Sequence, residues 1–182
     1  MKKLIIKKGH HYPCPIDFGG FLLKRFKPGM VYQLFTHFKF NNTCVYDIDK
    51  DQSDVNKLIG VSLGNHHKNS IRVGWRCKEN SIEICGYLYQ NGMRKPTIVI
   101  TSIPVTVCEF DLLLKYNSRI GTVSVELRQG SFIIGADVWQ FQYPYKKACW
   151  SYGLGLYFGG NRTAPKDMYI ERRDTKVKFF KG

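Results

Sequence analysis

The stretch that decides the fold runs from residue 71 to 98 and reads IRVGWRCKENSIEICGYLYQNGMRKPTI. Apolar and polar residues alternate in 71–77 and again in 82–89, which is the period of a half-buried β-strand. Asn91-Gly92 supplies the two positive-φ positions of a type I′ turn and so predicts a tight hairpin with a defined register. We therefore expect an antiparallel β-sandwich or jelly roll.

The rest of the chain repeats this pattern in short segments separated by turns. We expect strands at 30–40, 58–63, 71–77, 82–89, 97–102, 106–115, 121–128, 131–134, 155–157 and 168–173. A short helix fits only residues 137–145, where Pro144 would end it. Many short strands, no internal repeat and no boundary between domains predict one all-β domain over residues 31–173.

Both ends of the chain are basic. The 182 residues carry 28 basic and 14 acidic side chains, a net charge of +14, whereas solubility needs only about 2–8. Residues 1–30 and 174–182 are interpreted as terminal arms, because Pro and Gly interrupt the first of them. The arm cations are Lys2, Lys3, Lys7, Lys8, Lys24, Arg25, Lys27, Arg172 and Arg173. This charge predicts an acidic protein partner, another copy of the chain, or nonspecific contact with DNA.

The cysteines and the N-terminal sequence indicate the cellular compartment in which the protein is expected. Cysteines 14, 44, 77, 85, 108 and 149 form no C-x-x-C pair, and three of them lie in apolar strand patterns. We interpret them as small buried hydrophobes in a reducing compartment, with a disulfide framework as the alternative. The apolar run Leu4–Ile6 is too short for a signal peptide, and no run reaches a transmembrane length. We therefore expect no membrane location.

Two sets of residues were weighed as metal sites. Asp47, Asp49 and Asp51 resemble the start of an EF-hand loop, but Gln52 stands where Gly is needed and Leu58 where Glu is needed. A solvated acidic loop is the favoured interpretation, with an irregular calcium site as the alternative. The adjacent pairs 10–11 and 66–67 are histidines without a third ligand at metal spacing. We expect no metal and no cofactor.

Catalytic motifs are weak. The chain has no G-x-S-x-G elbow. Glu109 and Asp111 share one face of a predicted strand, as paired carboxylates for glycosidic hydrolysis would, but Leu113 follows on that face. A strand edge with surface acids explains the pair equally well, so no catalytic residue is assigned.

Aromatic and amide side chains are better candidates for binding. Tyr87, Tyr89 and Glu83 share one face of the strand at 82–89, and Trp150 offers another flat surface. Asn65, His66 and Asn69 could line a ligand groove beside them. The alternative is that the tyrosines cover the second sheet. Trp75 is expected in the core, and Arg72 and Arg76 on the opposite face, paired with Glu83. No motif for specific nucleic-acid binding is present.

Two segments carry a resemblance. Residues 64–76 with 87–94 resemble a family of uncharacterised proteins of Bacteroidetes and their phages. Residues 157–168 resemble the closing loop and last strand of that family, and also concanavalin-like (laminin-G/glucanase) jelly rolls. The glucanases use the motif E-x-D-x-x-E, and residues 109–114 here read EFDLLL, without the last acid. The resemblance thus implies a concanavalin-like jelly roll that does not hydrolyse glycans.

The function expected from these features is that of a non-enzymatic interaction module. The phage resemblance implies a virion component, such as a tail or capsid accessory protein, located in the virion or in the host cytoplasm during assembly. Its partners would be other virion proteins or copies of itself, held through the arms. A carbohydrate-binding module is the first alternative, and a glycoside hydrolase or polysaccharide lyase that depends on Glu109 is the second.

Overall fold

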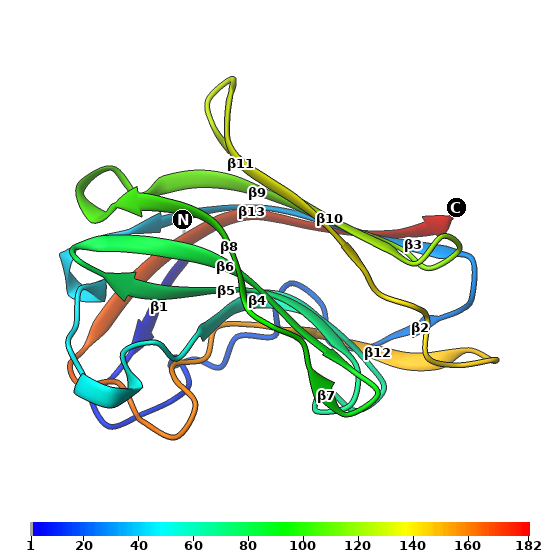
Figure 1. Ribbon diagram of the computed structural model, residues 1–182, viewed down its shortest axis with the longest axis horizontal. Helices are drawn as coiled ribbons and strands as arrows, with labels where there is room; N and C mark the ends of the chain where they lie inside the picture. The colour runs from blue at the N-terminus through cyan, green and yellow to red at the C-terminus, as the bar shows by residue number, and fades with distance from the viewer. Residues whose placement is uncertain (1) are drawn as a thin grey trace.

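The computed structural model describes residues 2–182 as two antiparallel sheets stacked on each other (Figure 1). One sheet has six strands in the order β1-β13-β3-β9-β10-β11. The other has seven, β2-β12-β4-β5-β6-β7, with β8 also paired to β6. The predicted fold class, an antiparallel β-sandwich of the jelly-roll type, is confirmed.

The strands take these bounds: β1 Lys2–Ile6, β2 Lys24–Phe26, β3 Met30–Phe40, β4 Asn56–Leu63, β5 Ser70–Lys78, β6 Ser81–Gln90, β7 Met93–Arg94, β8 Ile98–Pro104, β9 Glu109–Asn117, β10 Thr122–Gln129, β11 Phe132–Gln140, β12 Cys149–Leu154 and β13 Met168–Lys181. Three short 3₁₀ helices are η1 Asn42–Cys44, η2 Asp49–Asp51 and η3 Val105–Val107. The described residues include no helix long and apolar enough to cross a bilayer.

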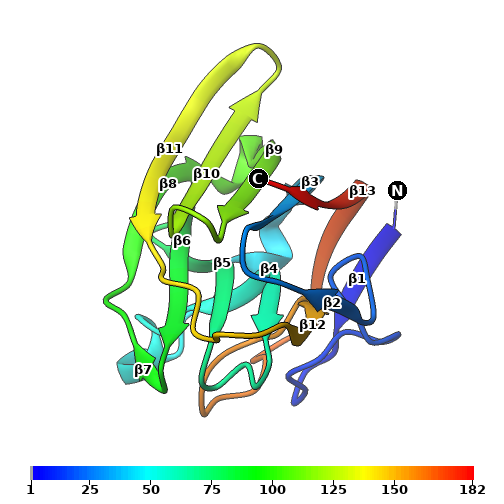
Figure 2. The same ribbon diagram turned by 90° about the vertical axis from the view of Figure 1, so that its right-hand side faces the viewer.

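The deciding stretch folds as predicted. Strands β5 and β6 form an antiparallel pair from Ser70↔Tyr89 to Lys78↔Ser81. Asn91 and Gly92 have φ angles of +54° and +80° in the turn that joins β6 to β7, as a type I′ turn requires. The β5–β6 pair lies inside the seven-stranded sheet, and β7 lies at its edge (Figure 2).

Alternation along β5 decides which side chains enter the core. Ile71, Val73 and Trp75 are fully buried between the sheets, which confirms the core assignment of Trp75. The residues between them face away from the core, and Arg72 is among these. Four of the cysteines, at 44, 77, 85 and 108, are buried, and all six are free thiols.

Two local predictions were wrong. The strand expected at 155–157 is instead a single bridge between Tyr157 and Lys57, and the strand of this region, β12, ends at Leu154. The helix expected in 137–145 does not form, because β11 continues to Gln140 along β10. Pairing with β10 therefore outweighs the local helical pattern, since every β11 residue except Ile134, at a bulge, gains a ladder partner.

The interpretation of the ends as free arms was also wrong. Strand β1 pairs with β13, β2 pairs with β12, and β13 runs along β3 as far as Lys181. In Figure 2, β1 lies beside β13, and β2 lies beside β12. Lys7 forms an ion pair with Asp167 at 2.7 Å. Pairing with a neighbouring edge satisfies the backbone groups of both ends, so these segments belong to the sheets.

A buried ion pair fixes the N-terminal segment against the last strand. Arg172 donates from Nη1 and Nη2 to the two carboxylate oxygens of Asp17 at 2.6 and 2.7 Å. Both side chains are almost completely buried. Gly155 leaves room for Asp17, because a Cβ there would collide with its carboxylate. The segment containing Asp17 therefore packs closely against the end of β12.

Candidate functional site

A groove of about 540 Å³ lies on the outer face of the seven-stranded sheet. Strands β4, β5, β6 and β12 form its floor, and the N-terminal segment 12–18 and the loop 155–161 form its walls. The volume is within the range of about 300–1,000 Å³ that is usual for ligand pockets. Aromatic, cationic and imidazole side chains dominate the lining.

Arg72 projects from β5 into this groove. Its Nε atom is buried and has no hydrogen-bond partner in the described chain. Burial lowers the pKa of the Arg72 guanidinium, and the nearby Tyr87 and Tyr152 oppose this shift. Buried polar groups in proteins are normally satisfied. A buried guanidinium donor without an acceptor is therefore prepared for an anionic or hydrogen-bonding ligand.

Lys57 adds a second cation beside Arg72. Its Nζ donates to the Gly159 carbonyl at 2.7 Å and lies 4.9 Å from the ring centroid of Tyr87 and 5.4 Å from that of Tyr157. Burial and the positive charge of Arg72 lower the pKa of Lys57 to about 8, although Asp54 acts in the opposite direction. Two like charges held this close favour binding of an anion.

No free carboxylate balances these cations at the described lining. Asp17 is the acidic residue of the lining, and Arg172 occupies both of its oxygens. The backbone N–H groups of Leu156 and Gly19 also donate to it, at 3.0 and 3.2 Å. The groove therefore presents net positive charge to a ligand.

A histidine–tyrosine pair stands next to Arg72. His66 Nδ1 and the Tyr152 hydroxyl lie 2.7 Å apart. Burial, then the charges of Arg72 and His67, lower the pKa of His66 to about 4. The imidazole is thus neutral at neutral pH and can accept a proton. Such a pair is a common arrangement for general acid–base chemistry.

Tyr157 forms the opposite wall. His11 stacks on its ring with centroids 4.9 Å apart and 6° between the planes, and the edge of Tyr12 contacts the same ring. Burial raises the pKa of the Tyr157 phenol, although Arg72 opposes this shift. The hydroxyl therefore stays protonated at neutral pH and can donate a proton.

The sequence-predicted binding residues divide into two groups. His66, Tyr87 and Tyr89 line the groove. Asn65 and Asn69 hold the β4–β5 loop instead: the Asn65 side chain accepts from the His67 N–H, and the Asn69 side chain accepts from the Asn91 N–H.

Glu83 and Trp150 lie outside the lining. Glu83 accepts from Arg76 Nε at 2.6 Å, which confirms the expected pairing for Arg76. Arg72 does not pair with Glu83, because the register places it opposite Tyr87. Trp150 lies further along β12 and is 59% exposed.

Sequence reasoning missed three groove residues, Lys57, Arg72 and Tyr157, as site residues, and it counted Tyr152 only among several aromatic binding candidates. Arg72 did carry a signal, since it stands at an outward position between two core residues. Lys57 carried none, because a β-bulge between Lys57 and Ile59 changes the alternation in β4.

The paired carboxylates Glu109 and Asp111 lie on the other sheet. His37 Nδ1 is 2.8 Å from Asp111 and Nε2 is 3.0 Å from Glu109, and Lys39 Nζ lies 3.1 Å from Glu109. Every acid of this cluster thus has a basic partner. In the Asp47–Asp51 loop, Asp51 pairs with Arg162. No described group of three or more His, Cys, Asp or Glu residues could hold a metal ion.

Solved structures share this fold at low sequence identity. An alginate lyase from Pseudomonas aeruginosa is 12% identical with a TM-score of 0.57, over 83% of this chain and 65% of that one. An alginate lyase from Chlorella virus is 10% identical with a TM-score of 0.56, over 98% and 84%. A functionally unknown protein from Saccharomyces cerevisiae is 9% identical with a TM-score of 0.59, over 99% and 88%. The chain thus spans slightly less than two thirds of the Pseudomonas enzyme.

Two further structures, each with a TM-score of 0.57 and 8% identity, are of family 7 alginate lyase variants with bound oligosaccharide. One has a tyrosine replaced and holds product, and the other has a histidine and a tyrosine replaced and holds substrate. No family model matches the chain, and no curated protein matches it.

These findings correct the expected function. The similar structures support a jelly-roll fold and give no support to the phage or Bacteroidetes resemblance, to a virion location or to a structural role. Most of the neighbours are enzymes that cleave a polysaccharide, which overturns the expectation of a non-enzymatic module. The physical basis of that expectation is also lost, because the supposed assembly arms are strands of the sandwich.

Proposed function

We propose that this protein is a polysaccharide lyase that cleaves an acidic, uronate-containing polysaccharide by β-elimination. The observation that carries the proposal is Arg72, a guanidinium with a buried, unpartnered Nε, set among tyrosines and a neutral histidine in a groove without a free carboxylate. A hexuronate supplies the carboxylate that this arrangement lacks.

The first requirement of such a reaction is to neutralise the substrate carboxylate. β-Elimination removes the proton on C5, next to the C6 carboxylate, and a negative charge there makes that proton hard to remove. On this proposal, Arg72 and Lys57, which both line the groove, bind the carboxylate and stabilise the charge that develops on it. Preorganised cations in a partly desolvated groove act more strongly than in water.

The second requirement is a base. We assign the Tyr152 oxygen as the group that takes the C5 proton while the Tyr152 hydroxyl proton passes to His66 Nδ1, 2.7 Å away. The positive charge of Arg72 contributes to the low pKa of His66. A bound carboxylate would offset that charge, so substrate binding itself would make His66 a better proton acceptor.

The third requirement is an acid for the leaving oxygen. The C5–H electron pair forms the C4=C5 double bond, the C4–O4 bond breaks, and its electrons stay on O4. On this proposal, Tyr157, which lines the groove and whose phenol is kept protonated by burial, donates a proton to O4. The products are a shortened chain with a new hydroxyl and a chain that ends in an unsaturated uronate.

The similar structures support these assignments by the type of residue involved. The alginate lyase variants that hold product or substrate lack a tyrosine, or a histidine and a tyrosine. The groove of this chain places those residue types next to its two cations. Alginate is therefore the first polysaccharide to test, followed by other polyuronates.

The test is the appearance of unsaturated uronate, which absorbs in the ultraviolet, when the protein is mixed with alginate or another polyuronate. A neutral glucan should give no signal. Arg72→Ala should lower kcat/KM by about 10²–10³-fold, as expected for loss of one charge-stabilising donor group. The matched control is Arg173→Ala, which removes the same charge from the opposite sheet and should leave the rate unchanged.

Two results would count against the proposal. Cleavage that yields only saturated ends would indicate hydrolysis. Tight binding without any cleavage across the polyuronates would indicate a carbohydrate-binding module, the first alternative suggested by the sequence.

A further inference from the structure

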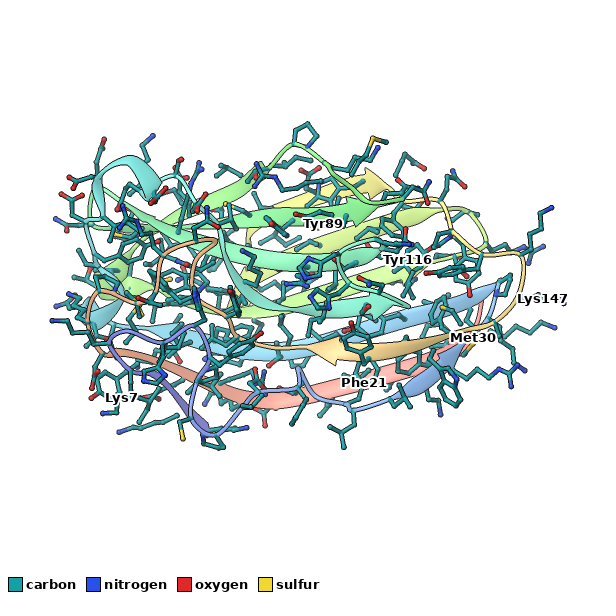
Figure 3. All side chains as sticks on the ribbon, turned by 90° about the horizontal axis from the view of Figure 1, so that it is seen from below. Lys7, Phe21, Met30, Tyr89, Tyr116 and Lys147 are labelled. Carbon is teal, nitrogen blue, oxygen red and sulfur yellow. The ribbon has the colours of Figure 1, made fainter. Side chains whose placement is uncertain are left out.

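A basic surface that the lyase chemistry does not use lies at one end of the molecule. Lys27, Arg119 and Lys181 surround a hollow formed by the β2–β3 turn, the β9–β10 turn and the end of β13. The loop before β12 joins this end, because the Tyr143 hydroxyl lies 3.1 Å from the carbonyl oxygens of both Phe26 and Lys147 and can donate to either. Figure 3 places Lys147 and Met30 together at this end, with Lys7 at the opposite end.

Acidic residues are missing from every segment that builds this end. None occurs in 18–46, 112–125, 138–166 or 175–182. Within the described chain, the basic side chains of this end form no ion pair; they are Lys24, Arg25, Lys27, Arg119, Lys146, Lys147 and Lys181. Unpaired like charges held close together repel one another. Binding of a polyanionic partner would relieve this repulsion, so the surface favours such a partner.

Strand β12 connects this surface to the groove. Alternation puts Leu154, Tyr152 and Trp150 on one face of the strand, and the first two of these line the groove. Trp150 therefore lies about 7 Å beyond Tyr152 along the strand, at the rise of about 3.4 Å per residue. Arg25 of β2 is the register partner of Trp150, so its side chain leaves the sheet on the same face.

Trp150 has no role in the fold that would explain its exposure. Its side chain is 59% exposed, whereas Trp75 and Trp139 are 0% and 5% exposed. An exposed indole beside a guanidinium offers a flat apolar face next to a positive charge. Sugar rings stack on the first, and uronate carboxylates pair with the second.

We infer that Trp150 and Arg25 form an outer subsite that holds the acidic polysaccharide where it leaves the groove, with the basic end beyond them receiving the rest of the chain. This inference rests on the proposed function and adds the path and minimum length of the substrate. The complementary charge and the unbroken outer face of β12 favour a polyuronate as the occupant over a protein or a nucleic acid.

The experiment measures binding of a uronate trimer and a uronate decamer to the Tyr152→Phe protein, in which cleavage is suppressed. Trp150→Ala should weaken decamer binding about three- to tenfold, and Arg25→Gln about two- to fivefold. Trimer binding should not change, because the trimer fills only the groove. Trp150→Phe should retain most of the decamer affinity, since it keeps an aromatic face.

The matched control is Lys178→Gln, which removes one charge at the same end of the molecule from the six-stranded sheet. If it weakens decamer binding as much as Arg25→Gln does, only overall charge is acting and the subsite is refuted. Tighter binding of a single-stranded oligonucleotide of equal charge would also refute it.

The two proposals fail differently in this experiment. If the trimer binds and decamer affinity is unaffected by Trp150→Ala, the subsite is wrong and the groove assignment stands. If neither uronate binds the parent protein, the lyase proposal and the subsite both fall.

Discussion

The outer faces of the two sheets carry opposite kinds of charged cluster. On the six-stranded sheet, His37 contacts Glu109 and Asp111, and Lys39 and Arg173 contact Glu109 as well. On the seven-stranded sheet, Arg72 and Lys57 lie in a groove whose described lining has one acid, Asp17, and that acid is already paired with Arg172. In the first cluster the acidic and basic side chains neutralise each other, whereas in the second the cations have no acidic partner of their own. Cations that the fold leaves without a partner are therefore better candidates for a functional site than charges that are already paired.

Tyr152→Phe should have the largest effect, and it tests whether the groove of the seven-stranded sheet is the reactive one. Loss of the hydroxyl removes the proposed base and should lower kcat by about 10²–10⁴-fold, with little change in binding. Steady-state kinetics on polyuronate measures it. Tyr169→Phe, on β13 of the other sheet, is the matched control and should cleave at the parent rate. Equal activity in both variants would remove Tyr152 from the mechanism.

The next largest effect concerns the one acid that lines the groove. Asp17→Asn leaves the buried guanidinium of Arg172 without its counter-charge and should lower the free energy of unfolding by about 3–5 kcal/mol. Chemical denaturation measures the loss. The double variant Asp17→Asn with Arg172→Met should recover much of the stability, because no unpaired charge remains. If the single variant is as stable as the parent, the ion pair does not hold the groove wall.

A smaller effect is expected from pH. The pKa of Lys57 is lowered to about 8, so this side chain is charged below pH 8 and neutral above it. If its charge helps to bind the uronate, kcat/KM should fall as the pH rises through 8, by about tenfold at pH 9. Lys57→Arg, which stays charged, should remove this alkaline limb. An identical profile in that variant would assign the limb to another group.

Sequence periodicity was sufficient to predict the fold class, but it predicted the groove only in part. The alternation in 71–77 and 82–89 and the Asn91-Gly92 turn predicted the central meander correctly. His66, Tyr87 and Tyr89 were also proposed as ligand contacts from the sequence, and they line the groove. These residues are close in sequence to the deciding hairpin, so local pattern could place them.

The rest of the groove depends on long-range pairing that local pattern does not contain. Tyr157 reaches Lys57 through one bridge across about a hundred residues, and Arg172 meets Asp17 across 155. The basic ends were interpreted as free because Pro and Gly interrupt the N-terminal segment. Their backbone pairing with distant strands, β1 with β13 and β2 with β12, became apparent only in three dimensions.

Glu109→Gln should have the smallest effect, and it tests whether the six-stranded sheet takes any part in catalysis. Had Glu109 been a catalytic carboxylate, as the hydrolase alternative required, this change would abolish cleavage. The structure places Glu109 on the six-stranded sheet, where it is 41% exposed and paired with Lys39 and His37.

The Lys39 ammonium and His37 lower the pKa of Glu109, so the contribution of this carboxylate to stability is present above the ordinary carboxyl pKa and is lost in acid. Exposed pairs contribute about 0–1 kcal/mol, so we expect a loss of this size at neutral pH, none at low pH, and an unchanged rate of polyuronate cleavage. Denaturation at both pH values measures the change in stability, and the cleavage assay measures the rate. A large loss of activity would show that the cluster around Glu109 on the six-stranded sheet takes part in catalysis.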